Sequence, residues 1–233
     1  MRILVACEES QAVTKELRRL GHEAYSCDII ECSGGHPEWH IMQDVLPLVN
    51  GHCEFDTMDG ESHLIDQKWD MLIAFPPCTH IAVSGARHFT KKLADGRMRD
   101  GVWFFCQFLH ADCERVAIEN PVNIIHGTFA ADHFPDLAAA YGLPAKSTQH
   151  IQPYMFGDPF RKKTNLWLKG LPNLEATEVV KPLIKEYVCK TGKIHSFSAD
   201  YGSGSKTSGQ RRSKTYPGIA RAMAEQWAGK CEV

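Results

Sequence analysis

The chain has 233 residues, of which 43% are hydrophobic and 23% charged, with a formal net charge of -2 at pH 7. These values suit one folded domain and exclude a chain that coats nucleic acid by net charge alone. No signal peptide and no apolar run of roughly eighteen residues is present, so we expect a soluble cytoplasmic protein that enters no membrane. The nine scattered cysteines form no C-x-x-C pair, which argues against a disulfide framework or a zinc ribbon.

The amino-terminal region predicts a strand, a helix and a second strand, which is one βα unit of a parallel sheet. The expected elements are a strand at residues 2–7, a helix at residues 10–20 with Ser10 as its cap, and a strand at residues 23–29. Asp28 ends the second strand, where it either accepts hydrogen bonds from ribose hydroxyls or is simply solvated. The first loop reads CEES and lacks the glycines of a dinucleotide fingerprint.

The next thirty residues are rich in Gly, His, Asp and Pro, and they include a short strand-like piece at residues 39–42 that is followed by Asp44. Three potential metal ligands recur here at intervals of four: Cys32, His36 and His40. The glycines and the proline between them disfavour the helix that would bring these side chains together, so no metal site is expected.

Residues 71–75 (MLIAF) form an apolar run that Pro76 and Pro77 end, which is the pattern of a buried strand. Ligands bind at the carboxyl ends of the strands in open α/β sheets, so Cys78 follows at a position where such folds carry out chemistry. Two interpretations remain open: Cys78 is a nucleophile on a stiff turn, or it is a buried and inert thiol.

We interpret residues 81–99 as a loop with an excess of basic side chains. These side chains either face solvent or lie over an anionic substrate. They are Arg87, His88, Lys91, Lys92, Arg97 and Arg99.

An apolar helix at residues 101–113 and a strand at residues 115–118 follow, and the strand leads into Glu119 and Asn120. Neighbouring parallel strands end at the same edge of a sheet, so Glu119 is expected beside Cys78. A carboxyl group next to a thiol can perform acid–base work on a ring that is under nucleophilic attack.

The last third of the chain predicts two strands, a polar loop and a closing helix. The expected elements are strands at residues 147–154 and 164–168, a loop at residues 196–213 and a helix at residues 216–229. Arg161 and Lys163 precede the second of these strands beside aromatic residues. This composition suits phosphate and base contacts, although strand aromatics more often belong to a core.

These motifs together resemble the DNA cytosine-5 methyltransferases, and more closely the short versions encoded by phages and prophages. Members of that family carry a Pro-Cys turn after the fourth strand and a Glu-Asn dipeptide after the fifth. The resemblance covers most of the chain and implies a Rossmann-like S-adenosylmethionine-dependent methyltransferase fold, with a mostly parallel sheet and helices on both faces. It further implies a catalytic and cofactor-binding domain at residues 1–169 and 213–233, with residues 170–212 as a small variable or target-recognition insertion.

The resemblance also implies a reaction. Cys78 would add to C6 of a cytosine flipped out of double-stranded DNA, Glu119 would hold and protonate N3, and C5 would take a methyl group from S-adenosylmethionine. Arg161 and Lys163 would steady the cytosine and its phosphate. The cofactor-binding residues implied in the same way are Cys7, Glu8, Ser10, Asp28, Ile29, Asp44, Phe75, Pro76 and Ser213.

The chain departs from the family at several points. The first loop lacks its usual glycines, Thr79 stands where glutamine is usual, and Pro121 replaces valine. The short insertion predicts that DNA specificity is short, relaxed or supplied by a partner protein. Two alternatives stay open: a related enzyme that modifies another pyrimidine or transfers a different group, and a non-catalytic module that binds nucleic acid or a host protein.

Overall fold

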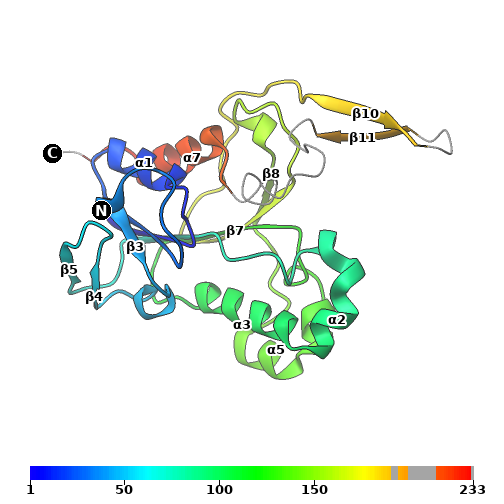
Figure 1. Cartoon of the computed structure of the whole chain (residues 1–233), viewed down its shortest axis with the longest axis horizontal. Helices are drawn as coiled ribbons and strands as arrows, with labels where there is room; N and C mark the ends of the chain where they lie inside the picture. The colour runs from blue at the N-terminus through cyan, green and yellow to red at the C-terminus, as the bar shows by residue number, and fades with distance from the viewer. Residues whose placement is uncertain (190–193, 199–213, 232–233) are drawn as a thin grey trace.

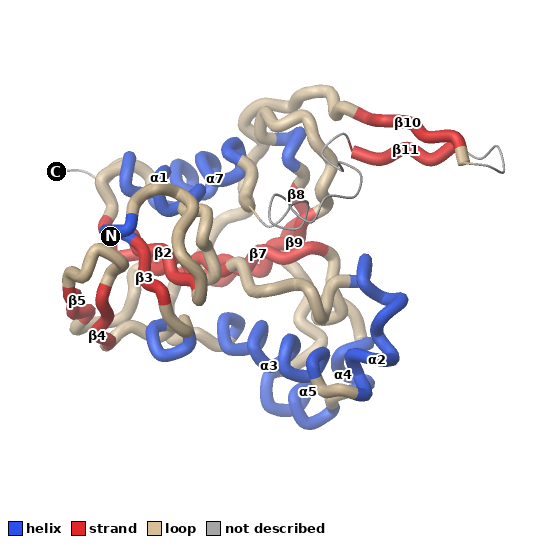
Figure 2. The backbone as a smooth tube through the Cα atoms, in the orientation of Figure 1, coloured by secondary structure: helices blue, strands red, loops and turns tan. Residues whose placement is uncertain are grey.

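A computed structural model describes residues 1–189, 194–198 and 214–231. Its centre is a seven-stranded sheet in the order β3-β2-β1-β6-β7-β9-β8 (Figure 2). The strands in chain order are β1 (Arg2–Ala6), β2 (Glu23–Asp28), β3 (His40–Met42), β6 (Met71–Ala74), β7 (Val116–Pro121), β8 (Gln149–Ile151) and β9 (Thr164–Lys169). The pairs from β3 to β7 are parallel, and β9 runs antiparallel to both β7 and β8. The expectation of a mixed α/β protein with a mostly parallel sheet is confirmed.

The strands β1 and β6, at the centre of the sheet, are buried on both faces. Every residue of β6 is buried, as are residues 3–6 of β1, which fits their nearly continuous apolar sequences. Successive side chains point to opposite faces, so Leu4 and Leu72 join one apolar cluster while Ile3 and Ile73 join the other. The sheet therefore separates two halves of the core.

Helices cover both faces of the sheet (Figure 1). One face carries α1 (Ala12–Arg19), α7 (Pro217–Met223) and a final π-helical turn (Ala224–Ala228). The other face carries α2 (Phe89–Ala94), α3 (Arg97–Leu109), α4 (Phe129–His133) and α5 (Pro135–Tyr141). No helix among the described residues is long and apolar enough to cross a membrane.

Two antiparallel hairpins stand outside the main sheet. One pairs β4 (Cys53–Asp56) with β5 (Ser62–Ile65), and the other pairs β10 (Ile184–Val188) with β11 (Ile194–Ser198). The β10–β11 hairpin extends away from the body of the molecule (Figure 1). Neither hairpin was predicted from the sequence. The β11 strand overlaps the start of the loop that was predicted at residues 196–213. The rest of that loop, residues 199–213, lies outside the described residues.

The prediction of a loop at residues 81–99 is wrong. This segment forms a 3-10 helix (Val83–His88), then α2, then the first turn of α3. Its helices are short and polar, so they show little hydrophobic periodicity. They are held by a few contacts to distant residues, such as the ring of Phe89 packed 5.4 Å from that of Phe129.

Two strand boundaries also differ from expectation. β7 does not stop before Glu119 but continues to Pro121, because β9 keeps pairing with it up to Thr164. The strand expected at residues 147–154 is shorter, since β8 ends at Ile151 and a 3-10 turn (Pro153–Met155) follows. The partner strand β9 therefore sets the end of β7, whereas the turn that begins at Pro153 follows the end of β8.

The packing of α7 gives a first prediction. A side chain at Gly218 would collide with the backbone carbonyl of Phe156, and the amide of Gly218 donates a 2.9 Å hydrogen bond to Oδ2 of Asp158. Gly218→Ala is therefore expected to destabilise the fold by about 3 kcal/mol in urea unfolding. Gly127→Ala is the matched control, because a Cβ there meets no atom within 4 Å. Equal stability of the two variants would contradict this packing.

Candidate active site

The parallel pairing of β6 with β7 brings the two principal candidate residues to one edge of the sheet. Ala74, the last residue of β6, lies opposite Ile118 of β7, so Glu119 is the next residue along its strand. β6 ends where Pro76 and Pro77 follow, and Cys78 comes directly after this turn. Cys78 and Glu119 are both half-buried.

The chain segments that follow these two residues remain paired beyond the sheet. The amide of Val83 donates to the carbonyl of Val122 at 3.0 Å, and the amide of Ile124 donates to the carbonyl of Ile81 at 3.1 Å. An isolated antiparallel bridge between Ala82 and Asn123 lies between these bonds. The turn that carries Cys78 is therefore tied to the segment after Glu119 and not only to β6.

Hydrogen bonds hold the turn itself at several carbonyls. The carbonyl of Cys78 accepts bonds from the amides of Ile81 and Ala82, at 3.1 and 2.8 Å. The side chain of Asn120, which is 1% exposed, donates to the carbonyl of Pro76 at 2.7 Å. Nζ of Lys92 donates to the carbonyl of Thr79 at 2.5 Å. The thiol is thus presented on a turn whose backbone is fixed on both sides.

Arg161 and Lys163 precede β9 at the same edge of the sheet. Thr164, the first residue of β9, pairs with Pro121 at the end of β7. Because β9 is antiparallel to β7, its beginning lies where β6 and β7 end, and both basic side chains are exposed there. The backbone thus brings the four predicted catalytic positions to one edge.

The residues expected to bind a cofactor follow the ends of β1, β2 and β6. Ala6 pairs with Cys27 of β2 on one side and with Ala74 of β6 on the other. The strand order changes direction between β1 and β6, and such a switch point opens a crevice at the carboxyl ends of the strands. Cys7 and Phe75 follow directly after the strands that flank this crevice, and Pro76 lies next in the turn.

The environment of this crevice is acidic. The pKa of the Cys7 thiol is raised well above its usual value, first by burial and then by the negative charges of Asp28 and Asp44. Burial also raises the pKa of Asp28, against the opposing effect of backbone amides at Ile29 and Ile30. Asp44 is exposed and accepts a 3.1 Å bond from the amide of Leu46, while the side chain of Ile29 is 75% exposed.

The first loop makes its turn without glycine. Cys7 (φ 59) and Gln11 (φ 55) both adopt the left-handed conformation that glycine usually supplies. Gln11 is fully buried, and its side-chain amide donates to the carbonyl of His36 at 2.8 Å and accepts from the amide of His36 at 3.1 Å. These bonds fix the loop before β3 against the loop after β1.

Glu8, rather than Ser10, caps α1. The Glu8 carboxylate accepts hydrogen bonds from the amide of Val13 at 2.6 Å, the hydroxyl of Thr14 at 2.7 Å and the amide of Thr14 at 3.2 Å. The expected cap at Ser10 is wrong because α1 begins only at Ala12, and the residue before it makes no side-chain cap bond. Burial, partly offset by these bonds, raises the pKa of Glu8 to about 7.

Ser213 lies outside the described residues. The neighbouring Lys214 lies next to the first loop, because its Nζ donates to Oγ of Ser33 at 2.7 Å and lies 3.9 Å from Oε1 of Glu9. The chain therefore returns to the first loop directly before α7, which packs against α1 in the same half of the core.

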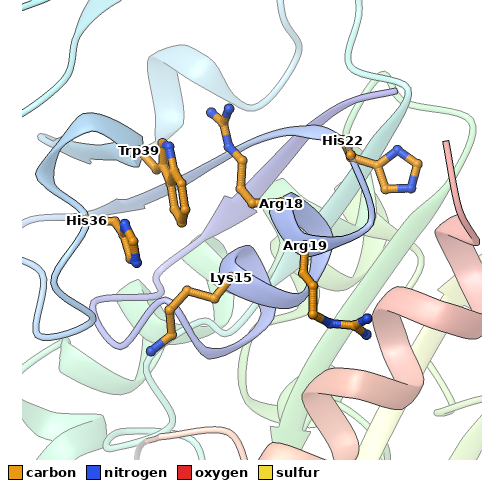
Figure 3. A pocket seen from close by; sticks show the side chains of 7 residues that line it. Lys15, Arg18, Arg19, His22, His36 and Trp39 are labelled. Atoms are coloured by element: carbon orange, nitrogen blue, oxygen red, sulfur yellow. The ribbon is translucent and has the colours of Figure 1, made fainter. Parts of the chain in front are cut away.

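A separate hollow of about 540 Å³ lies beside α1 (Figure 3). It is lined by Lys15, Arg18, Arg19, Gly21, His22, His36 and Trp39. Several of these basic groups are already engaged: Arg18 donates to the carbonyl of Ala24 at 2.7 Å, and Arg19 pairs with Glu16 and Glu225 at 2.8 and 3.0 Å. We interpret these contacts as holding α1 to its neighbours.

Sequence reading did not single out Lys92, Gln11 or Asn123. Lys92 appeared only as one member of a basic cluster, yet it is just 7% exposed. Gln11 and Asn123 are buried amides. The side chain of Gln11 anchors the backbone at His36, whereas Asn123 is joined to the distant Ala82 by a backbone bridge. No local pattern marks such residues, because their partners are set by the tertiary fold.

No protein-family model and no curated protein matches the sequence. Among solved structures, the chain is similar to one from E. coli that is described as a putative DNA modification methyltransferase encoded within a prophage. The identity is 11% and the TM-score is 0.42, and the alignment covers 78% of this chain and 52% of that one. The chain thus spans about half the length of that protein.

The buried carboxylate of Glu8 predicts a specific dependence of stability on pH. Folded Glu8 titrates at a pKa of about 7, whereas the ordinary value is 4.5, so the folded state keeps a proton that the unfolded chain releases. Stability therefore falls as the pH rises from 4.5 to about 7. The loss attributable to Glu8 is about 3 kcal/mol.

Glu8→Gln removes this titration while keeping the size of the side chain. The measurement is urea unfolding of both proteins between pH 4 and pH 8. The wild type is expected to lose stability relative to the variant between pH 4.5 and about 7, and the difference in stability is expected to stay constant above that range. A constant difference in the free energy of unfolding across the whole pH range would show that Glu8 does not cause the loss of stability.

Proposed function

We propose that the protein transfers a methyl group from S-adenosylmethionine to C5 of cytosine in double-stranded DNA. The observation that carries the proposal is the pairing of β6 with β7, together with the bonds that join the segments after them. This pairing holds a thiol and a carboxyl group, Cys78 and Glu119, at neighbouring strand ends. Those are the two groups that nucleophilic addition to a pyrimidine ring needs.

In the proposed reaction, the Cys78 thiolate forms a bond to C6 while the C5–C6 π electrons move toward C5. Glu119 holds N3 and gives it a proton, which balances the charge of the addition. When bound, S-adenosylmethionine would supply the activated methyl group that C5 takes up, with S-adenosylhomocysteine as the leaving group. A base removes the C5 proton, the electron pair restores the double bond, Cys78 leaves as a thiolate, and N3 returns its proton to Glu119. The target base must first leave the duplex, since C6 is otherwise stacked.

The residues around the crevice fit a cationic cofactor better than a phosphorylated one. The amino terminus of α1, where dinucleotide folds bind pyrophosphate, is occupied here by the carboxylate of Glu8. Asp28 and Asp44 add negative charge beside Cys7, which suits the positive sulfonium and ammonium groups of S-adenosylmethionine. In this proposal Asp28 binds the ribose, and Asp44 and Ile29 hold the adenine.

The remaining predicted cofactor residues have proposed places around the same crevice. Phe75 and Pro76 would line the adenine pocket from the end of β6. Cys7 and Ser10 would contribute through the first loop, and Ser213 would approach with the segment that precedes α7. Because Cys7 and Gln11 supply the left-handed turns, the missing glycines do not prevent this loop from forming.

Contact with DNA is proposed for the side of the molecule that carries Arg161 and Lys163. Residues 170–212 form the reduced recognition region in this proposal, and they include the projecting β10–β11 hairpin. A two-stranded ribbon fits the major groove of B-DNA. Basic residues outnumber acidic ones between residues 179 and 214, although the whole chain has a net charge of -2. A partner protein remains the alternative source of specificity.

Mass analysis of nucleosides from a treated DNA library tests the proposed function. Wild-type protein with S-adenosylmethionine is expected to produce 5-methylcytosine, and Cys78→Ala is expected to abolish it because Cys78 is the one cysteine in the segment FPPCTH that follows β6. Glu119→Gln is expected to slow the reaction by about 10²- to 10⁴-fold.

Cys231→Ala is the matched control, because Cys231 is an exposed cysteine at the far end of the chain. It should retain full activity. A mass gain on another base, or a gain other than one methyl group, would replace the proposal with the related pyrimidine-modifying enzyme. Full biological function of Cys78→Ala in a cell would instead support a non-catalytic binding module.

A further inference from the structure

Lys92 is a buried ammonium group that forms no ion pair with a carboxylate among the described residues. It lies in α2 and is only 7% exposed, whereas the adjacent Lys91 is exposed. Among the described residues, no ion pair includes Lys92. A buried charge is costly unless it is paired, so an ammonium group in this position calls for a negative charge nearby.

The contact that Lys92 does make lies within the turn that presents Cys78. Its Nζ donates to the carbonyl of Thr79, the residue directly after the cysteine. Gly85 leaves room for this contact, because a Cβ at that position would lie 3.2 Å from Nζ of Lys92. The buried ammonium group is thus directed at the peptide next to the thiol.

A second buried group holds the opposite side of the same turn. Asn120 donates to the carbonyl of Pro76, and Oδ1 of Asn120 accepts a 3.0 Å bond from Nδ2 of Asn123. Oδ1 of Asn123 accepts a 3.0 Å bond from the amide of Ile125. Carbonyls on both sides of Cys78 are therefore fixed, but only the bond on the Thr79 side carries a positive charge.

We propose that Lys92 is a positioning residue that holds the Cys78 turn and favours the thiolate form of Cys78 through its buried positive charge. This inference deepens the proposed function, on which it rests for its meaning in catalysis. In this proposal the Cys78 thiolate supplies the negative charge that the described residues do not place beside Lys92.

Any test must distinguish the effect of Lys92 on Cys78 from the effects of the other charged groups around the turn. His80 lies on the turn, and its pKa is lowered by burial and then by the charges of Lys92 and Arg97. Asp95 and Asp100 act on His80 in the opposite direction. Glu119 faces the same edge from β7. These groups remain present when Lys92 alone is replaced, so the variant isolates the contribution of Lys92.

The test is the pH profile of alkylation of the free enzyme by iodoacetamide, read at Cys78 by peptide mass spectrometry. Lys92→Met is expected to slow alkylation of Cys78 about tenfold at pH 7 and to move the midpoint of its profile to higher pH. Lys92→Arg keeps the positive charge and is expected to restore most of the rate. Lys91→Met removes a neighbouring exposed charge and is expected to leave the profile unchanged.

Cys231, which is exposed, provides an internal reference within each sample, and its rate should be the same in all variants. An unchanged Cys78 midpoint in Lys92→Met, or an equal shift in Lys91→Met, would overturn the proposal. A thermal melt checks that each variant is folded, and Lys92→Arg keeps the test decisive if Lys92→Met unfolds. The assay needs neither DNA nor cofactor, so its outcome is independent of whether the protein methylates cytosine.

Discussion

The pairing between the end of β6 and the end of β7 is the constraint on which the candidate site depends. Two parallel strands place Cys78 and Glu119 at one edge, and the bonds around the Ala82–Asn123 bridge continue that pairing past the sheet. A turn held only by its own strand would leave the thiol free to move relative to the carboxyl group. Here the two segments form one unit, and Asn120 and Lys92 fix the carbonyls on either side of the cysteine.

Acidic side chains surround the part of the site where a cofactor is proposed to bind. The first loop directs a carboxylate into the amino terminus of α1 and collects further acids around Cys7. This arrangement removes the anion site that a dinucleotide-binding protein uses at the same place. It also accounts for the absence of a glycine-rich sequence, since Cys7 and Gln11 supply the left-handed backbone and Gln11 adds hydrogen bonds that glycine cannot make. The candidate cofactor crevice is thus built by side chains as well as by backbone.

The sequence predicted the parallel core well because its signals are local. The apolar runs of β1 and β6 and the prolines after β6 identify buried strands, and strand polarity then places Cys78 and Glu119 at one edge. Segments stabilised by distant partners could not be predicted in this way. The helices within residues 81–99 are short and polar, and β7 is longer than expected because β9 continues to pair with it. Lys92 and Gln11 show no local signal, because burial and hydrogen bonds to residues distant in the chain define them.

The central claim is that Cys78 forms a covalent bond to a pyrimidine in DNA. The most direct measurement is the intact mass of the protein after incubation with S-adenosylmethionine and a duplex library that contains 5-fluorocytosine, which blocks the final loss of the C5 substituent. A stable protein–DNA adduct that is present in wild type and lost in Cys78→Ala is the predicted result. No adduct across a mixed-sequence library, or an adduct that persists in Cys78→Ala, would contradict the claim.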